Sequence, residues 1–370
     1  MRQTSPLIFQ VIPTLQLGGA ERFVIELSDR LSDRGFRVKL LVLFDRGPLW
    51  DEVRSRNISW SQIVSSHASS RLDVMRSLQK RFFCEEDLRR PAIVHTHLFG
   101  SDFWTAVAVE TRMLFGHRDH THPSLISTVH NIDHEDGTLR RLARRWAMRR
   151  FDHVVGVSED AMHYAVSDLG VSSDRASWID GMNVLSSRSG VVSRFHETPR
   201  FLSIGRLVEQ KGFATALKAL SKITLPWEYT IVGEGELERS LKELAESLGI
   251  ASRVHFIGAQ SDIRPHLESA DVLLMPSKWE GLGMVALEAI SYGVPVLASD
   301  VPALKTVLPD SQRIPVGDID AWTARIQQSL ERPGDLLEGI RGLQKETLSR
   351  FDPDRITDAY ADLYSTMLKQ

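Results

Sequence analysis

Short apolar runs alternate with amphipathic stretches along almost the whole chain, and this alternation restricts the folds that the sequence can adopt. In the first half, strand-like runs lie at residues 7–12, 37–44, 92–97, 125–129 and 154–157. Between them, stretches such as 20–34 and 102–114 carry apolar residues at helical spacing. Strands that alternate with helices form βαβ units and a parallel sheet. The predicted fold class is therefore α/β.

The same pattern restarts after a polar, serine-rich stretch at residues 186–199. Its strands are predicted at residues 201–204, 229–232, 254–257, 271–275 and 294–298. One buried helix face is marked by Leu237, Leu241, Leu244 and Leu248. Because 370 residues exceed one ordinary core, we expect two domains, at residues 1–188 and 189–352. A final helix at residues 353–370 is followed by no strand and can pack back on the first domain.

Composition and charge exclude several classes of protein. The formal net charge of −3 gives no basic field, which argues against a nucleic-acid partner. The single cysteine, Cys84, rules out an internal disulfide and suits a reducing compartment. The N-terminal residues run into the first strand without a long apolar segment, and no apolar run approaches about 18 residues. We therefore expect a cytoplasmic protein without a signal peptide or a transmembrane helix.

Four charged side chains follow two of the predicted strands in the second half. Arg206 and Lys211 come after residues 201–204, and Glu280 and Glu288 come after residues 271–275. Both groups should emerge at the carboxyl edge of a parallel sheet, where open α/β sheets bind ligands. Two cations suit a diphosphate, and two carboxylates suit the hydroxyls of a sugar. The chemistry that needs all four together is the transfer of a sugar from a nucleotide diphosphate.

An ordered series of short motifs covers nearly the whole chain. These motifs are Gly18-Gly19-Ala20-Glu21-Arg22, Ser127-Thr128-Val129-His130-Asn131, Gly156-Val157-Ser158, Ser203-Ile204-Gly205-Arg206 with Lys211-Gly212, Ile231-Val232-Gly233-Glu234-Gly235, Phe256-Ile257-Gly258 and residues 280–288. In this order they resemble the retaining GT-B glycosyltransferases of family 4. The resemblance implies two Rossmann-like domains facing a central cleft, a nucleotide-sugar donor bound mostly by the second domain, and no required metal or other cofactor. One departure is Asp180-Gly181-Met182-Asn183, where the family commonly has an Asn-Gly turn, so Asn183 is given no ligand contact.

The resemblance also implies roles for individual residues. Arg206 and Lys211, with the Gly18-Gly19 turn, would bind the donor diphosphate, while Glu288 would hold the ribose. Glu280 and His130 would contact the donor sugar. The other donor-binding positions are Gly205, Gly233, Gly258, Gly281, Leu282 and Gly283. His97 is a weaker candidate for the acceptor side.

Each of these groups also has a plain structural interpretation. Gly18-Gly19 can be a turn that needs positive φ rather than a phosphate site at a helix start. Arg206 and Lys211 can be solvated surface cations, and Glu288 a helix-surface acid. However, Glu288 stands among apolar neighbours, and a carboxylate in such surroundings needs a partner. His130 can simply cap the end of a strand.

Several motifs suggest metal or dinucleotide binding but are explained more simply. His117, His120 and His122 have no Cys or clear carboxylate to complete a metal site, and we interpret them as part of a polar loop. Asp318-Ile319-Asp320 and Asp352-Pro353-Asp354 lie near predicted helix starts, where Asp is a preferred cap. Gly233-Glu234-Gly235 lacks the third glycine of a dinucleotide fingerprint. We therefore predict no metal site.

Taken together, the sequence predicts a retaining, metal-independent glycosyltransferase that moves a hexose-type sugar from a UDP- or GDP-sugar to a glycan or a lipid-linked saccharide. Front-face attack assisted by the leaving phosphate follows from the resemblance. Two alternatives stay open. One is a nucleotide-sugar epimerase or a glycan phosphorylase of the same fold, and the other is a non-catalytic protein that binds a nucleotide sugar.

The segment at residues 138–150 contains six arginines and an apolar line formed by Leu139, Leu142, Ala143 and Trp146. Basic amphipathic helices of this kind lie on anionic membrane surfaces. The alternative is an internal helix whose apolar line packs on the sheet while its arginines face water. We predict peripheral contact with the inner face of the cytoplasmic membrane through this helix.

Overall fold

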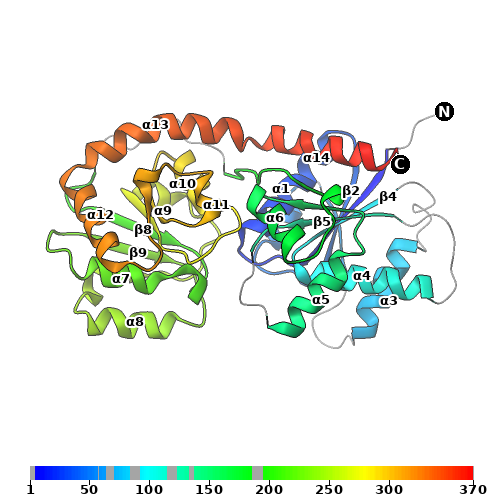
Figure 1. Cartoon of the computed structure of the whole chain (residues 1–370), viewed down its shortest axis with the longest axis horizontal. Coiled ribbons are helices and arrows are strands. Elements are labelled where there is room, and N and C mark those ends of the chain that lie inside the picture. The colour runs from blue at the N-terminus through cyan, green and yellow to red at the C-terminus, as the bar shows by residue number, and fades with distance from the viewer. Residues whose placement is uncertain are drawn as a thin grey trace. The chain divides into compact units, whose positions relative to one another are not determined.

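The computed structural model describes residues 5–56, 58–63, 71–83, 92–114, 123–132, 137–185 and 195–369. The chain separates into two compact units (Figure 1). Unit 1 contains Met1–Met182 together with Pro353–Gln370, and unit 2 contains Asn183–Asp352. Cys84, His117, His120 and His122 lie outside the described residues.

Unit 1 is a parallel sheet covered by helices on both faces. Its strands are β1 (Leu7–Thr14), β2 (Arg37–Asp45), β3 (Ser59–Gln62), β4 (Ala92–His97), β5 (Ser124–Val129), β6 (His153–Gly156) and β7 (Ala176–Trp178). Its helices are α1 (Gly19–Asp33), α2 (Trp50–Ser55), α3 (Arg71–Phe83), α4 (Phe99–Leu114), α5 (Thr138–Met148), α6 (Glu159–Ser167) and α14 (Pro353–Met367). The strand order is β3-β2-β1-β4-β5-β6-β7, and all pairs are parallel. Helices α1 and α14 pack together on one face, and α3, α4 and α5 follow one another on the other (Figure 1).

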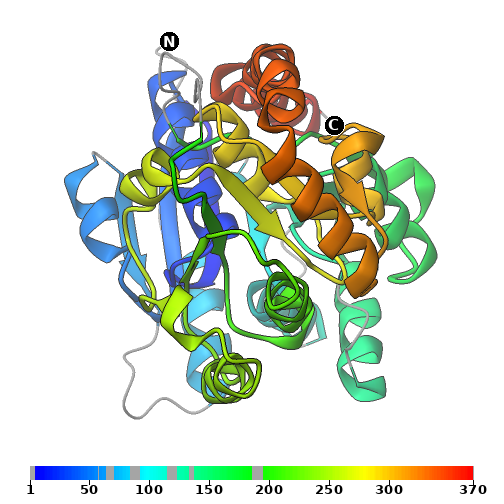
Figure 2. The ribbon, with the colours of Figure 1, turned by 90° about the vertical axis from the view of Figure 1, so that its left-hand side faces the viewer.

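Unit 2 repeats this architecture with six strands. They are β8 (Arg200–Ile204), β9 (Glu228–Val232), β10 (Val254–Phe256), β11 (Val272–Met275), β12 (Val296–Ser299) and β13 (Arg313–Ile314), in the order β10-β9-β8-β11-β12-β13. Its helices are α7 (Phe213–Leu220), α8 (Glu238–Ser247), α9 (Arg264–Ser269), α10 (Met284–Ser291), α11 (Pro302–Lys305), α12 (Ile319–Glu331) and α13 (Pro333–Arg350). Figure 2 shows α7 and α8 on one side of the sheet and α10 on the other.

Counted within each unit, the first six strands have the order 3-2-1-4-5-6, which is that of a Rossmann fold. The α/β prediction of two Rossmann-like domains is therefore confirmed. Continuous apolar runs explain the sheets, because a strand covered by helices on both faces is buried on both sides. All four residues of β11 are buried, as are the first six of β1. The short strands β3, β7 and β13 are not apparent from the sequence pattern.

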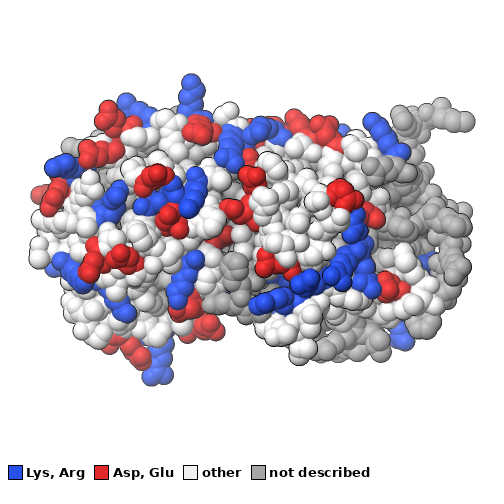
Figure 3. All heavy atoms as spheres, viewed as in Figure 1, with Lys and Arg blue, Asp and Glu red and all other residues white. Residues whose placement is uncertain are grey.

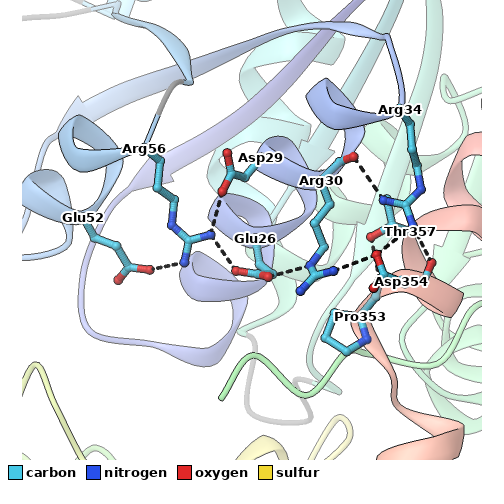
Figure 4. Close-up of polar contacts among 9 residues, drawn as sticks. All are labelled: Glu26, Asp29, Arg30, Arg34, Glu52, Arg56, Pro353, Asp354 and Thr357. Atoms are coloured by element: carbon cyan, nitrogen blue, oxygen red, sulfur yellow. Dashed lines mark hydrogen bonds and ion pairs between the residues drawn. The ribbon is translucent and has the colours of Figure 1, made fainter. Parts of the chain in front are cut away.

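Helix α14 is fastened to α1 by ion pairs at the surface of unit 1 (Figure 4). Arg30 and Arg34 both bind the Asp354 carboxylate, at 2.7 and 3.0 Å, and Arg34 also binds Asp358 at 2.6 Å. Further along α1, Glu26 joins Arg30 to Arg56, with both contacts at 2.6 Å. The C-terminal helix therefore belongs to the sheet formed by the first half of the chain.

Among the helices of the described residues, none is both long enough and apolar enough to cross a membrane.

Candidate functional site

In unit 2 the strand order reverses between the neighbouring strands β8 and β11. Open parallel sheets bind ligands at the carboxyl ends of the strands that flank such a reversal. Two polar loops occupy this place. Residues 205–212 follow β8 and include a 3₁₀ turn at Glu209–Lys211, and residues 276–283 follow β11. Arg206, Lys211 and Glu280 all lie on these two loops.

The two loops are joined to each other by backbone contacts. The Lys278 amide donates to the Gln210 carbonyl at 2.8 Å, and the Gln210 side chain donates to the Trp279 carbonyl at 3.0 Å. Gly212 has φ +64°, and a Cβ there would lie 2.1 Å from the Pro276 carbonyl oxygen. Only glycine satisfies both conditions, because it tolerates positive φ and leaves room for the second loop. The glycine after Lys211 thus lets the two loops approach.

This approach brings Lys211 and Glu280 into direct contact. The Lys211 Nζ donates to Glu280 Oε1 at 2.6 Å, although the residues are 69 positions apart. Their side chains are 16% and 7% exposed, so the pair is largely shielded from water yet reachable at its rim. Arg206 is exposed and has no ion-pair or side-chain partner within the described ranges of the chain. The loop after β8 therefore offers one cation held by a carboxylate and one that is available to an anion.

Three predicted glycines form a row across the ends of β8, β9 and β10. The Gly205 amide donates to the Val232 carbonyl at 2.9 Å, and the Gly233 amide donates to the Gly258 carbonyl at 2.8 Å. A Cβ on Gly233, whose φ is +143°, would lie 1.9 Å from the Gly205 carbonyl oxygen. This row keeps the strand ends close together. Its glycines therefore have a structural role that does not depend on a ligand.

The segment from Gly281 to Glu288 enters helix α10. Gly283 is the N-cap of α10, so the prediction that a helix begins near this glycine is confirmed. Gly281, Leu282 and Gly283 are buried, and Glu288 is only 4% exposed. A carboxylate with this little exposure is not the surface acid of the alternative interpretation. Its contact with a ribose stays a prediction.

In unit 1 the first candidate is the Gly18-Gly19 turn after β1. Gly18 is the extended N-cap of α1, with φ −147° and ψ 160°, and Gly19 is the first residue of that helix. Positive φ at glycine occurs elsewhere in the described residues but at neither of these two, so a turn that needs positive φ does not explain them. The first backbone amides of a helix suit a phosphate, but here the Glu21 carboxylate folds back toward Gly18, and the phosphate contact stays a prediction.

His97 ends β4, and His130 directly follows β5, so the two imidazoles lie side by side. His97 Nδ1 and His130 Nε2 are 2.9 Å apart, and the Phe23 ring packs edge-on against His130 with 5.1 Å between the ring centroids. Burial lowers the pKa of His130 to about 3 and holds the pKa of His97 well below its ordinary value, with repulsion from His95 and His130 adding to the shift of His97. Both rings are therefore neutral at physiological pH.

The two histidines, of which His97 was the candidate for the acceptor side and His130 for the donor sugar, differ in accessibility. His130 keeps part of its surface exposed, whereas His97 is fully buried. Both ring nitrogens of His97 are engaged, Nδ1 by His130 and Nε2 by Gln10 Oε1 at 2.7 Å. His97 therefore has no ring nitrogen left for an acceptor. The residue after it, Leu98, has φ +69°, which is uncommon outside glycine and marks a strained turn into α4.

Sequence reasoning missed the polar residues buried beneath these histidines. Gln10, His95, Tyr360 and Tyr364 are all 0% exposed and are hydrogen-bonded to one another or to His97 and Thr128. The available signal was the presence of Gln10 and His95 inside otherwise apolar strands, since a buried polar group requires a partner.

The predicted helix caps can be compared with the structure. Asp318 caps α12 by accepting from the Ala321 amide at 3.0 Å, as predicted. Asp354 lies in the first turn of α14 and binds Arg30 and Arg34. The described part of the chain contains no group of three or more His, Cys, Asp or Glu side chains arranged to hold a metal ion.

Two Rossmann-type units in one chain are the architecture of the GT-B class of proteins. Comparison with known families agrees with this class. The profile of the family 4 glycosyltransferases matches residues 17–180, and that of the group 1 glycosyl transferases matches residues 190–341. The chain belongs to the GT-B glycosyltransferases of these families.

Individual proteins show the same likeness. The lipopolysaccharide core biosynthesis glycosyltransferase LpsE of Rhizobium meliloti is 34% identical over 175 residues, which are 46% of this chain and 51% of LpsE. The chain thus spans about half the length of this relative. Anabaena HepE, solved with UDP-glucose, superposes with a TM-score of 0.82 at 17% identity, covering 97% of this chain and 99% of HepE. A glycosyltransferase of Rickettsia africae superposes with a TM-score of 0.77 at 17% identity, covering 99% of both chains. At these identities the structural likeness establishes the fold.

Proposed function

We propose that the chain is a retaining glycosyltransferase that moves a hexose-type sugar from a UDP- or GDP-sugar to a glycan or a lipid-linked saccharide. The observation that carries the proposal is the contact of Lys211 with Glu280 at the strand reversal of unit 2, on the loop that also carries the exposed Arg206. Support comes from LpsE, which is named for lipopolysaccharide core biosynthesis, and from HepE, which was solved with UDP-glucose.

The proposed chemistry follows from where charge develops. As the bond between the anomeric carbon and the diphosphate breaks, the leaving diphosphate gains negative charge, which Arg206 and Lys211 would stabilise more strongly than in the ground state. Glu280 would hold Lys211 in place before the donor arrives and accept hydrogen bonds from sugar hydroxyls. The acceptor hydroxyl would attack from the face that the diphosphate leaves, and its proton would pass to the departing phosphate oxygen. The new glycosidic bond then keeps the anomeric configuration.

A two-stage experiment tests this proposal. Thermal unfolding with UDP, GDP and ADP identifies the nucleotide, because a ligand at about 100 times its Kd stabilises a protein by ~2.7 kcal/mol. Turnover with labelled UDP- or GDP-sugars and a saccharide acceptor then measures transfer. A nucleotide-induced shift without transfer for any donor would favour a non-catalytic binding protein and overturn the proposal.

Two finer parts of the proposal have tests of their own. Nuclear magnetic resonance of the product reads its anomeric configuration, and an inverted product would refute retention. Because the proposed stabilisation uses protein cations, we expect turnover to persist in EDTA. Complete loss in EDTA that a divalent ion restores would refute metal independence.

We further propose that helix α5 contacts anionic membranes. Leu139 and Leu142 are 85% and 57% exposed, whereas Arg144 is buried. The alternative in which the apolar line packs inward is therefore wrong for these two leucines. Figure 3 shows basic side chains gathered on the face of unit 1 that carries α5. Exposed leucines beside arginines suit the boundary between lipid headgroups and acyl chains.

Sedimentation with anionic liposomes at low salt tests this contact. We expect wild type to bind and the combined variant Leu139→Ser, Leu142→Ser, Arg141→Ser to bind less, since each arginine near the surface contributes about 1 kcal/mol. The matched control is Arg239→Ser, Lys242→Ser on helix α8, which also carries exposed basic residues. Equal binding by all three proteins would exclude α5 as the docking surface.

A further inference from the structure

A continuous chain of hydrogen-bonded side chains runs through unit 1 from His130 to the C-terminal helix. From His130 Nε2 it passes to His97 Nδ1 at 2.9 Å, and from His97 Nε2 to Gln10 Oε1 at 2.7 Å. Gln10 Nε2 then reaches the Tyr364 hydroxyl at 3.0 Å, and that hydroxyl reaches His95 Nδ1 at 2.6 Å. The members therefore come from β1, β4, the end of β5 and α14.

The last links lead back to β5 and α14. His95 Nε2 is 2.7 Å from Thr128 Oγ1, which is 3.1 Å from the Tyr360 hydroxyl. Every member except His130 is at most 1% exposed. His130 is thus the one place where this chain of side chains meets the surface of unit 1.

The amide of Gln10 gives this hydrogen-bonded network a direction, because the amide nitrogen only donates and the amide oxygen only accepts. Since Oε1 accepts, His97 carries its proton on Nε2. Burial keeps His97 neutral, so its Nδ1 is a lone pair and must accept from His130 Nε2. His130 therefore carries its proton on Nε2. Within the described residues, no group pairs with His130 Nδ1.

The other half of the hydrogen-bonded network agrees with this direction of donation. The Tyr364 hydroxyl accepts from Gln10 Nε2 and can donate its own proton to His95 Nδ1. His95 is also held neutral by burial, so its proton lies on Nε2 and is donated to Thr128. Each buried donor and acceptor is matched, which is the condition under which a buried polar network is stable and specific.

We propose that Tyr364 and Gln10 act through His97 as positioning residues that hold His130 as the Nε2–H tautomer, so that its Nδ1 is offered to a ligand as a hydrogen-bond acceptor. The ligand chemistry that fits a neutral acceptor is a hydroxyl, and a sugar hydroxyl in particular. Only this last assignment rests on the proposed function. The tautomer itself is a property of the protein without ligand.

Nitrogen-15 magnetic resonance of histidine-labelled protein tests the tautomer directly, since protonated and bare ring nitrogens give well-separated signals. The His130 signals are assigned by their loss in His130→Asn. We expect a proton on Nε2 and a bare Nδ1 in the wild type. In Tyr364→Phe, Gln10 loses its acceptor and can turn its amide, so a second His130 population with Nδ1–H should appear.

Tyr360→Phe is the matched control, because it removes a hydroxyl from the same helix, one turn away, beyond Thr128. It should leave the His130 tautomer unchanged. With the donor sugar, Tyr364→Phe should lower kcat/KM about fivefold more than Tyr360→Phe, which is the size of one hydrogen bond. An Nδ1–H tautomer in the wild type, or unchanged His130 signals in Tyr364→Phe, would overturn the proposal.

Gln10→Met gives a second test if Tyr364→Phe perturbs folding, because it removes the amide and keeps the length of the side chain. It should also release the His130 tautomer, and a His130 that remains purely Nε2–H in this variant would overturn the proposal. These spectra need no nucleotide sugar. An expected tautomer in a protein that transfers no sugar would therefore count against the proposed function alone.

Discussion

The two units both place their candidate groups at the carboxyl ends of parallel strands but prepare them in opposite ways. In unit 2, Lys211 and Glu280 form a charged pair on loops, partly open to solvent. In unit 1, His130 ends a series of neutral, fully buried side chains on strands and on α14. A charged pair on a loop is suited to stabilise charge that develops on a ligand. A neutral buried network is suited to fix one hydrogen-bond direction.

The largest expected effect concerns the charged pair. Lys211→Ala and Glu280→Ala should each lower turnover on the order of a hundredfold, the usual loss when one charge-stabilising group is removed. Because the two side chains are only 16% and 7% exposed, each substitution also leaves one shielded group without its partner, and the free energy of unfolding should fall by roughly 1–3 kcal/mol. Steady-state kinetics and urea unfolding measure the two quantities. Lys222→Ala is the control, because Lys222 also pairs with a carboxylate at 2.6 Å, on the surface and away from the loops. Full turnover in either site variant would refute its role.

The second prediction concerns the neutral network and pH. The pKa values of His95, His97 and His130 are lowered in the folded protein, mainly by burial, so the unfolded chain takes up their protons first. Each should therefore destabilise unit 1 by about 1.4 kcal/mol per pH unit below pH ~6.5. Asp102 acts in the opposite direction, because burial raises its pKa to about 6 despite hydrogen bonds from Thr96 and Ser127 and attraction to Arg144. The net loss from these four groups should be roughly 3 kcal/mol per pH unit near pH 5.5, and His153, whose pKa is also lowered by burial, acts in the same direction.

Hydrogen exchange at pH 7.5 and 5.5, corrected for intrinsic rates, measures this loss locally. Strands β1, β4 and β5 should lose protection on acidification, while β8 and β11 should change little. His97→Gln removes one group that takes up a proton on unfolding. It should therefore reduce the pH dependence of the stability of unit 1. Equal sensitivity of both units to acid would contradict the contrast between them.

These contrasts show how far sequence reasoning reaches. The loops after β8 and β11 could be predicted, because apolar strands followed by polar residues identify a sheet edge. The Lys211–Glu280 contact could not, since it depends on Gly212 passing close to Pro276 across 64 positions of sequence. Gln10, His95 and Tyr364 likewise meet only in the folded sheet. In α5 the apolar pattern identified a helix but not its covered face, because burial of Arg144 in place of Leu139 is decided by neighbouring elements.

The smallest expected effect separates the two ways in which α14 is held on unit 1. Asp354 is 65% exposed although it binds Arg30 and Arg34, and exposed ion pairs contribute about 0.2–1 kcal/mol. Asp354→Asn should therefore lower the free energy of unfolding by less than about 1 kcal/mol, and less again in high salt. Asp320→Asn is the matched control, since Asp320 also lies in the first turn of a helix and pairs with one lysine. Tyr364→Phe should cost more, because it leaves Gln10 and His95 with unmet hydrogen bonds in the core. If urea unfolding instead showed a loss above ~2 kcal/mol for Asp354→Asn, the surface ion pairs, and not the buried tyrosine, would be what anchors the C-terminal helix.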